Sequence, residues 1–213
     1  MGEIVKPELL HLQVYQILKK SIMDGERKPS ERIVESQIAK QLGISRAPVR
    51  EAIRLLVHDG LLEHKGNFIV VYEPSVQDII EIFQCRQSLE ALAVQLAIEH
   101  GTEETFIKLK NNMEETERYL NNGMQLKQLD QQFHTIITNA SGNSHLIQLL
   151  ETIKTKIHYM RNSMVKTTFY PTLIDEHEKI LLYMEQKDVV RATETMKQHV
   201  QRGLDGILQQ LKN

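Results

Sequence analysis

The sequence predicts a mostly α-helical chain in two parts, a three-helix segment with a small β-hairpin and then an antiparallel α-helical bundle. Three observations predict this fold class. Apolar residues recur at helical spacing over most of the chain. The clearest β-rich run, residues 68–71, directly follows a Gly-containing turn. From Ser75 onward there is no strand pattern, and short connections between the expected helices favour antiparallel neighbours.

The first expected helix begins near Leu9 and ends at Asp24-Gly25. Its apolar stripe consists of Leu10, Val14, Ile17, Leu18 and Ile22. Pro29-Ser30 restarts the chain, and Ser30 is expected to cap a second, short helix over residues 31–42. Gly43 is the stop signal of that second helix.

The third expected helix begins after Ser45, its predicted N-cap. Pro48 is tolerated in the first turn, where a backbone N–H has no intrahelical partner. The helix ends at Asp59-Gly60, and residues 61–71 predict a hairpin around the turn Lys65-Gly66-Asn67. Three helices with a Gly-centred tight turn and a following hairpin predict a winged helix-turn-helix, over residues 1–73.

The second part, residues 74–213, is expected to be entirely helical, with Pro74 marking the linker. Cap and stop residues divide it into six helical segments. Their approximate ranges are 75–101, 102–121, 125–140, 144–166, 171–186 and 188–210. The short connections predict an antiparallel bundle.

Composition excludes several classes of protein. The formal net charge is −2 over 213 residues, so contact with nucleic acid requires a local basic patch. Aromatic residues make up 5% and Trp is absent, which argues against a base-stacking platform. The single cysteine excludes an intrachain disulfide and a multi-Cys zinc cluster. Because no run approaches the ~18 apolar residues of a membrane span and the N-terminus lacks a signal-peptide pattern, we expect a cytoplasmic protein without a membrane partner.

A basic stripe lies on the third expected helix. Arg46, Arg50 and Arg54 are four residues apart and therefore share one helix face. Arginine can bind guanine O6 and N7 with two hydrogen bonds, and residues at the N-terminus of such a helix lie deepest in the major groove. A solvated basic face is the alternative. The tight turn before the helix and the hairpin after it favour DNA binding.

Residues 42–62, LGISRAPVREAIRLLVHDGLL, closely resemble the signature of the GntR family of bacterial transcription regulators. The upstream stretch ERIVESQIAKQLGIS also fits. The resemblance implies that Ser45, Arg46 and Arg50 contact double-stranded operator DNA, and that Lys65 and Gly66, at the tip of the wing, enter the minor groove. One recognition helix reads too few base pairs for specificity in a genome, so a homodimer on a two-fold operator is expected.

One aspartate and three histidines form a second group that is expected to converge. Asp130 and His134 share one helix face. His177 and His199 are equidistant from residue 188 at a predicted turn, so in an antiparallel pair they lie at the same height. A carboxylate and three imidazoles suit a divalent ion such as Zn²⁺, Ni²⁺ or Mn²⁺. Histidines that pair with one another or are solvated are the alternative.

Residues 130–147, DQQFHTIITNASGNSHLI, resemble the FCD effector domain of the FadR-like branch of GntR regulators, in its six-helix, VanR-like version. The segments DEHEKIL, with His177, and MKQHV, with His199, match its other two metal positions. The resemblance implies a bound metal with open coordination sites, where a small carboxylate binds as the effector. Arg86, in CRQSLEALAVQLA, is the candidate for bidentate binding of that acid, and a pair with Glu90 is the alternative.

These features predict a bacterial, dimeric, metal-containing transcription regulator, a repressor whose operator binding responds to a small organic acid. A regulator that senses a divalent metal directly is the alternative. A metal-dependent hydrolase is disfavoured, because no H-E-x-x-H motif supplies a general base. Glu176 is the carboxylate next to His177, but adjacent helical residues point apart. We therefore expect a protein that is not an enzyme and has no catalytic residues.

Overall fold

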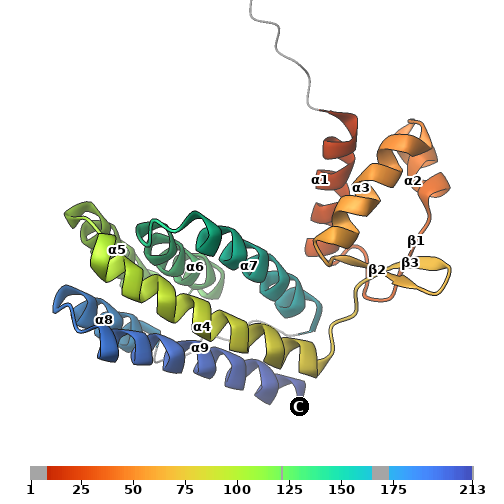
Figure 1. Cartoon of the computed structure of the whole chain (residues 1–213). Helices are drawn as coiled ribbons and strands as arrows, with labels where there is room; N and C mark the ends of the chain where they lie inside the picture. The colour runs from red at the N-terminus through yellow and green to blue at the C-terminus, as the bar shows by residue number, and fades with distance from the viewer. Residues whose placement is uncertain (1–8, 121, 165–172, 213) are drawn as a thin grey trace, which may run out of the picture. The chain divides into compact units, whose positions relative to one another are not determined.

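The computed structural model describes residues 9–120, 122–164 and 173–212, and it has the predicted fold class (Figure 1). The chain divides into two compact units, residues 1–75 with 158–163, and residues 76–157 with 164–213. The first unit contains a winged helix-turn-helix and the second a helical bundle. Across the described part of the chain, no helix is long and apolar enough to cross a membrane.

The first unit consists of three helices and a three-stranded antiparallel sheet of order β1-β3-β2, which share one hydrophobic core. The helices are α1 (Leu10–Met23), α2 (Glu35–Leu42) and α3 (Arg46–His58). The strands are β1 (Arg32–Ile33), β2 (Leu62–Lys65) and β3 (Phe68–Val71). The apolar stripes of α1 and α3 meet in the core, where Leu18, Val49 and Leu56 are fully or almost fully buried. The α3 helix is thereby fixed with its polar face outward.

The second expected helix begins later than predicted. Residues 32 and 33 form strand β1 instead, and Ile33 pairs with Ile69 of β3 while its side chain is buried. Val34 remains extended, so α2 starts at Glu35. Ser30 is not the N-cap: it has a positive φ of 61°, and its N–H donates to the carbonyl of Val71. The apolar side chain of Ile33 could be buried on a helix face or in a sheet, and in the structure it is buried in the sheet.

The turn before α3 and the wing are built as predicted. Gly43 closes α2 in the left-handed conformation, with φ 66°. Ser45 is extended at the N-cap position of α3, but its side chain makes no capping hydrogen bond. In the wing, Gly66 takes a φ of 61° between the paired strands β2 and β3.

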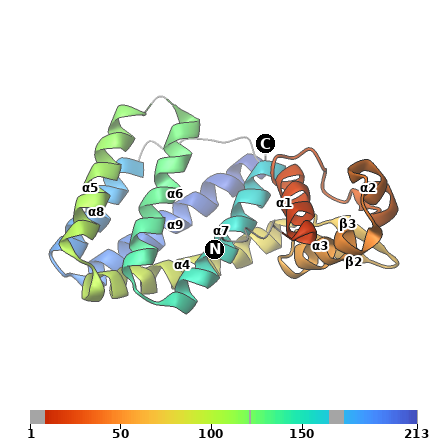
Figure 2. The ribbon, with the colours of Figure 1, turned by 90° about the horizontal axis from the view of Figure 1, so that it is seen from above.

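The six predicted helices follow, and all of them belong to the second unit except for residues 158–163 of the fourth, which are grouped with the first unit. They are α4 (Val76–His100), α5 (Glu103–Arg118), α6 (Gly123–Ala140), α7 (Ser144–Met164), α8 (Leu173–Glu185) and α9 (Val189–Leu211). Within the second unit α4 lies along α9, α8 packs on α9, and α5 packs on α6 (Figure 2). The expected end of the fourth segment at residue 166 and the expected start of the fifth at residue 171 lie outside the described residues.

The α8–α9 hairpin sets the height of two site histidines. Lys187 forms the turn with a positive φ of 57°. Asp188 caps α9, and its carboxylate accepts a hydrogen bond of 3.0 Å from the N–H of Arg191. The two helices therefore run antiparallel from residue 188, as the sequence predicts.

Candidate functional site

The predicted aspartate and three histidines come together in the bundle. Asp130 and His134 lie on α6, His177 on α8 and His199 on α9. One nitrogen or oxygen atom from each residue lies within 4.8 Å of the others. All three histidines are buried, and Asp130 is partly buried. The structure thus brings together four groups that are up to 69 residues apart in the sequence.

The Nε2 atoms of the three imidazoles point toward one another and toward one carboxylate oxygen. Oδ1 of Asp130 lies 3.6 Å from Nε2 of His134, 3.5 Å from that of His177 and 3.7 Å from that of His199. The Nε2 atoms of His134 and His199 are 3.1 Å apart. This is the donor set that a borderline divalent ion takes in proteins.

His177 has a buried nitrogen that the protein itself does not satisfy. Its side chain is 1% exposed, and its Nε2 makes no hydrogen bond within the described structure. Phe133 stacks on its ring, with centroids 3.8 Å apart and planes 5° apart. A buried polar atom without a partner costs free energy, so the orphaned Nε2 favours a bound group at this point. Burial lowers the pKa of His177 to about 4, so its lone pair is available at neutral pH.

A buried carboxylate contacts the far side of His134. Glu90 on α4 pairs with Nδ1 of His134 through one carboxylate oxygen. The other oxygen accepts a hydrogen bond of 2.5 Å from Nε of Arg86. Burial alone would raise the pKa of Glu90, but Arg86 and His134 outweigh it and lower that pKa to about 2. Glu90 is therefore an anion held between two donors.

His199 has the same kind of contact on its far side. Its Nδ1 lies 2.7 Å from a carboxylate oxygen of Glu176 on α8. The second oxygen of Glu176 lies 2.5 Å from Nε of Arg202. Burial lowers the pKa of His199, which leaves a neutral imidazole. Sequence reasoning missed the roles of Glu176 and Arg202, because no motif of the sequence links Glu176 on one helix to His199 and Arg202 on the next.

The remaining charges of the cluster are also shifted by burial and by one another. Burial raises the pKa of Asp130, but the adjacent His134 and His177 hold it well below its usual range. Burial lowers the pKa of His134, yet the Glu90 carboxylate at its Nδ1 reverses this, and the net shift is upward. A positive charge beside the Asp130 carboxylate is therefore favoured in this cluster.

Arg86, the candidate for effector binding, lies in this region but is engaged by Glu90. The pair is buried rather than on the surface, with side-chain exposures of 12% for Arg86 and 7% for Glu90. Binding of the effector and the pair with Glu90 would therefore both use the Arg86 guanidinium at the same point in the bundle. The Glu90 contact uses Nε of the guanidinium.

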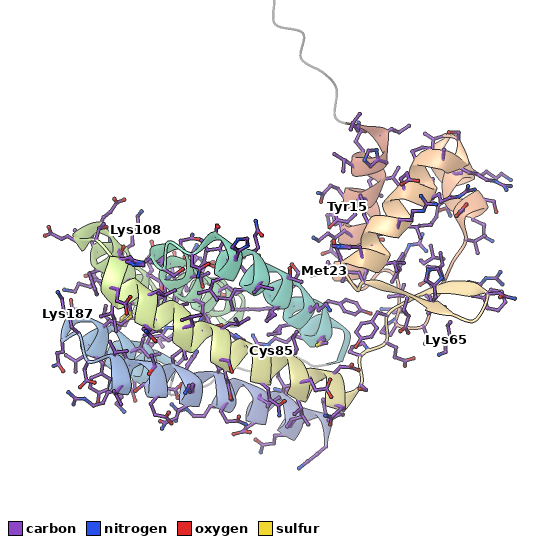
Figure 3. The ribbon with its side chains drawn as sticks, viewed as in Figure 1. Tyr15, Met23, Lys65, Cys85, Lys108 and Lys187 are labelled. Atoms are coloured by element: carbon purple, nitrogen blue, oxygen red, sulfur yellow. The ribbon has the colours of Figure 1, made fainter. Side chains whose placement is uncertain are left out.

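The predicted DNA-contacting residues lie on the outer face of the first unit. Ser45 and Arg46 are exposed at the N-terminus of α3, and no bond within the described residues engages the Arg46 guanidinium. Lys65, which is labelled in Figure 3, and Gly66 form the exposed tip of the wing, where strand β2 turns into β3. Next to the turn of the wing, where Phe68 pairs with Lys65, Arg32 stacks over the exposed ring of Phe68, 3.8 Å from its centroid.

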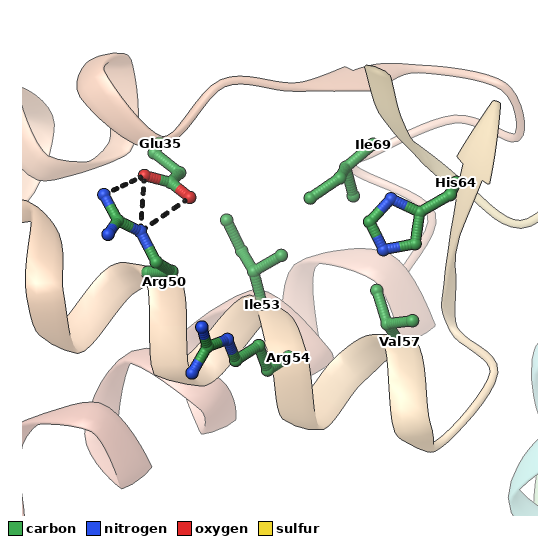
Figure 4. A pocket seen from close by; sticks show the side chains of 7 residues that line it. All are labelled: Glu35, Arg50, Ile53, Arg54, Val57, His64 and Ile69. Atoms are coloured by element: carbon green, nitrogen blue, oxygen red, sulfur yellow. Dashed lines mark hydrogen bonds and ion pairs between the residues drawn. The ribbon is translucent and has the colours of Figure 1, made fainter. Parts of the chain in front are cut away.

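Arg50 differs from Arg46, because an acidic residue engages it. Its guanidinium contacts both carboxylate oxygens of Glu35, the first residue of α2, at 3.3 Å (Figure 4). The pair lies at the edge of a cavity of about 310 Å³ between α3 and the wing. This cavity is lined by Glu35, Arg50, Ile53, Arg54, Val57, His64 and Ile69. Glu35 and His64 were not predicted, since no motif of the sequence singles them out.

Comparisons with known proteins identify both parts of the chain. The family model "Bacterial regulatory proteins, gntR family" matches residues 10–67. The model "FCD domain" matches residues 81–202. The two matches cover the winged helix-turn-helix up to the turn of the wing and most of the bundle.

Individual relatives match this chain over most of their length. The HTH-type transcriptional regulator YdhC of Bacillus subtilis is 39% identical over 200 residues, which are 92% of this chain and 88% of the relative. The HTH-type transcriptional repressor GlaR of Escherichia coli is 26% identical over 203 residues, 89% of this chain and 91% of that protein. The solved structure of E. coli McbR/YncC matches with a TM-score of 0.72 and 25% identity, over 96% of this chain and 99% of that one.

Proposed function

The chain belongs to the GntR family of bacterial regulatory proteins and carries an FCD domain, and from this premise we propose a repressor whose operator binding is changed by a small carboxylate at a metal site in that domain. That it is a transcriptional regulator follows from the family. One observation carries the rest of the proposal: three imidazole Nε2 atoms and one carboxylate oxygen converge, and the buried Nε2 of His177 makes no hydrogen bond within the described residues.

The residues present fit a divalent ion. Asp130, His134, His177 and His199 would hold it, with the ion completing the orphaned nitrogen of His177. Zn²⁺, Ni²⁺ and Mn²⁺ all accept this mixture of imidazole and carboxylate ligands. When bound, the ion supplies a Lewis-acid position at which the carboxylate of a small organic acid can bind. Arg86, close to the same cluster, is proposed to help bind that acid.

DNA binding is proposed to occur through α3 and the wing. Ser45, Arg46 and Arg50 on α3 are proposed to contact the major groove, and Lys65 and Gly66 the minor groove. We propose a homodimer, because two recognition helices are needed to read a two-fold operator. A regulator of this kind works where the chromosome is, so we expect it in the cytoplasm. Repression is supported by the relative GlaR, which is named a repressor.

Regulation would be a shift between two populations of the protein. A ligand that binds one conformation more tightly favours it by the difference in binding free energy. We propose that the acid-bound conformation has a lower affinity for the operator. Occupancy of the FCD domain and occupancy of the DNA are then linked, and each weakens the other by the same factor.

The contacts of Glu176 argue against hydrolysis at this site. A hydrolase would need a general base facing the reacting water. Glu176 instead contacts Nδ1 of His199 with one oxygen and Arg202 with the other, on the far side from the converging Nε2 atoms. Named relatives are transcriptional regulators. We therefore propose that the chain is not an enzyme.

A thermal-shift experiment on the full chain tests this function. The purified protein is heated with Zn²⁺, with a panel of dicarboxylates, tricarboxylates and sugar acids, and with EDTA. A ligand that binds only the folded state raises the melting temperature by mass action. We expect one acid to stabilise the protein and EDTA to abolish that effect. The same acid should weaken binding to an operator duplex obtained by binding selection.

The other outcomes contradict the proposal in distinct ways. If EDTA lowers the melting temperature but no acid changes it, and Zn²⁺ alone alters the affinity for the selected duplex, the chain senses the metal directly. If neither Zn²⁺ nor EDTA has any effect, the four residues do not form a metal site. If an acid stabilises the protein equally with and without EDTA, the effector binds elsewhere.

A further inference from the structure

Two buried glutamates contact the metal-site histidines from the side opposite the proposed ion. Glu90 contacts Nδ1 of His134, and Glu176 contacts Nδ1 of His199. Both glutamate side chains are 7% exposed. They come from α4 and α8, whereas the histidines that they contact lie on α6 and α9. The two contacts are therefore independent of each other and of local helix geometry.

These contacts decide which ring nitrogen faces the cluster. An ionised carboxylate only accepts hydrogen bonds, so Nδ1 must be the donor in each pair. A neutral imidazole with its proton on Nδ1 has its lone pair on Nε2. In both residues Nε2 is the atom that points to Asp130, at 3.6 Å from His134 and 3.7 Å from His199. The carboxylates thus hold a proton on Nδ1 and leave Nε2 as the nitrogen that can bind a metal ion.

Each glutamate is itself held by an arginine. Arg86 contacts Glu90 and Arg202 contacts Glu176, in both cases from Nε at 2.5 Å. The guanidinium groups limit the directions in which the carboxylates can turn. The Arg86 side chain is 12% exposed and that of Arg202 is 47% exposed. Solvent therefore weakens the outer contact more at Glu176 than at Glu90.

His177 is oriented by a different kind of contact. Its ring lies against Phe133, nearly parallel at 3.8 Å, and packing alone can hold an imidazole in this position. The cluster thus contains two histidines positioned by carboxylates and one positioned by an aromatic ring. Variants of the glutamates should leave His177 in place.

We propose that Glu90 and Glu176 are positioning residues of the metal centre, acting on the ion through His134 and His199 without touching it. This inference rests on the proposed metal site. The hydrogen bond from Nδ1 raises the basicity of Nε2 and removes the rotational freedom of the ring, so both effects increase metal affinity. Each glutamate acts on one histidine only.

The test compares Glu90→Gln and Glu176→Gln with Glu185→Gln in the full chain. Glutamine keeps the shape of glutamate but presents a neutral oxygen or an NH₂ group to Nδ1. Glu185 is a matched control, because it lies on α8 and its carboxylate pairs with Lys110 at 2.6 Å on the surface. Zn²⁺ affinity is measured by competition with a chromophoric chelator. We expect each of the two buried variants to bind Zn²⁺ about 10–100-fold more weakly, and the control to match the wild type.

A second measurement separates positioning from a general loss of structure. Two-bond ¹H–¹⁵N correlation spectra of the zinc-loaded chain report which ring nitrogen of each histidine is protonated. Glu90→Gln should change the signals of His134 and leave those of His199, and Glu176→Gln should do the reverse. A merely structural glutamate would change the signals of all the site histidines together or of none.

The outcomes distinguish this inference from the proposed metal site. If the wild type binds Zn²⁺ and both buried variants bind it within twofold of the wild type, the positioning role is wrong and the metal site stands. If the wild type binds no Zn²⁺, the metal site and the positioning role both fail. Weaker Zn²⁺ binding with the histidine-specific changes supports the inference.

Discussion

Replacing Arg46 by alanine should weaken recognition of the operator without destabilising the protein. Arg46 is exposed at the start of α3, and no hydrogen bond or ion pair within the described residues engages its guanidinium. Its removal therefore breaks no contact of the folded chain. Arginine and alanine are both good helix formers, so we expect the free energy of unfolding to change by less than about 0.5 kcal/mol.

The expected loss in DNA binding follows because the Arg46 guanidinium has no ion pair within the described residues to break before it binds DNA. A bidentate contact to guanine contributes about 1–3 kcal/mol of discrimination, which is about 5- to 150-fold in affinity. Arg50 must first leave Glu35, which it contacts at 3.3 Å with 53% of its side chain exposed. Such a pair is worth up to about 1 kcal/mol. Arg50→Ala should therefore cost up to about fivefold less than Arg46→Ala if both arginines bind guanine equally well.

Fluorescence anisotropy with two duplexes measures this effect. One duplex carries the sequence obtained by binding selection with the full chain, and the other has the same bases in scrambled order. Arg46→Ala should raise the Kd for the selected duplex by the stated factor and that for the scrambled duplex much less. Arg118→Ala is the control, because it removes the same charge from an exposed position on α5. It should change neither Kd.

Titrations at several salt concentrations identify the result that would refute this reasoning. If Arg46→Ala weakens both duplexes equally and reduces the salt slope by about one, Arg46 only anchors a phosphate. If the melting temperature falls together with the affinity, the Arg46 guanidinium makes a stabilising contact in the folded chain. The premise that its removal breaks no contact would then be wrong.

Three further changes test the site and the division into two units. The double variant His177→Ala/His199→Ala should retain no ion after dialysis, measured by elemental analysis, and should lose any acid response while still binding DNA; full ion content would show that the site lies elsewhere. Phe133→Ala removes a fully buried ring stacked on His177 and should cost about 3–5 kcal/mol of stability, together with weaker Zn²⁺ binding, in urea denaturation and chelator titration. Leu56→Ala, fully buried in the first unit, should cost about 2–5 kcal/mol there and reduce DNA binding, but Zn²⁺ affinity should stay unchanged if the two units fold independently.

Much of the fold could be predicted because the helices carry regular apolar stripes and clear end signals. Ser45, for example, precedes α3 as expected, and Lys187 and Asp188 form the turn before α9. Strand β1 could not be predicted, since two residues are too few to show an alternating pattern. Ile33 is buried in either conformation, and its partner Ile69 is far along the chain. Pairing with β3 therefore determines that residues 32 and 33 form a strand.

The four candidate metal ligands could be predicted from the sequence, but the residues that contact them could not. Distance from a turn predicts that His177 and His199 meet, and their ring centroids are 4.8 Å apart. The carboxylate behind His134 comes from Glu90, 44 residues away on another helix. At the sequence level Glu90 is simply the i+4 partner of Arg86, an arrangement common on solvated helix faces. Only the packing of α4 on α6 shows that this pair is buried and faces an imidazole.

The α8–α9 hairpin makes the cluster sensitive to the number of residues between its two histidines. Each helical residue advances the chain by about 1.5 Å and turns it by about 100°. One inserted residue between His177 and the end of α8, or between the start of α9 and His199, would therefore rotate one imidazole out of the cluster while both helices remained intact. An insertion at Lys187 falls in the turn and leaves both arms unchanged. Length variation among natural sequences that keep this cluster should accordingly be confined to the turn, and an engineered peptide tag is best placed there.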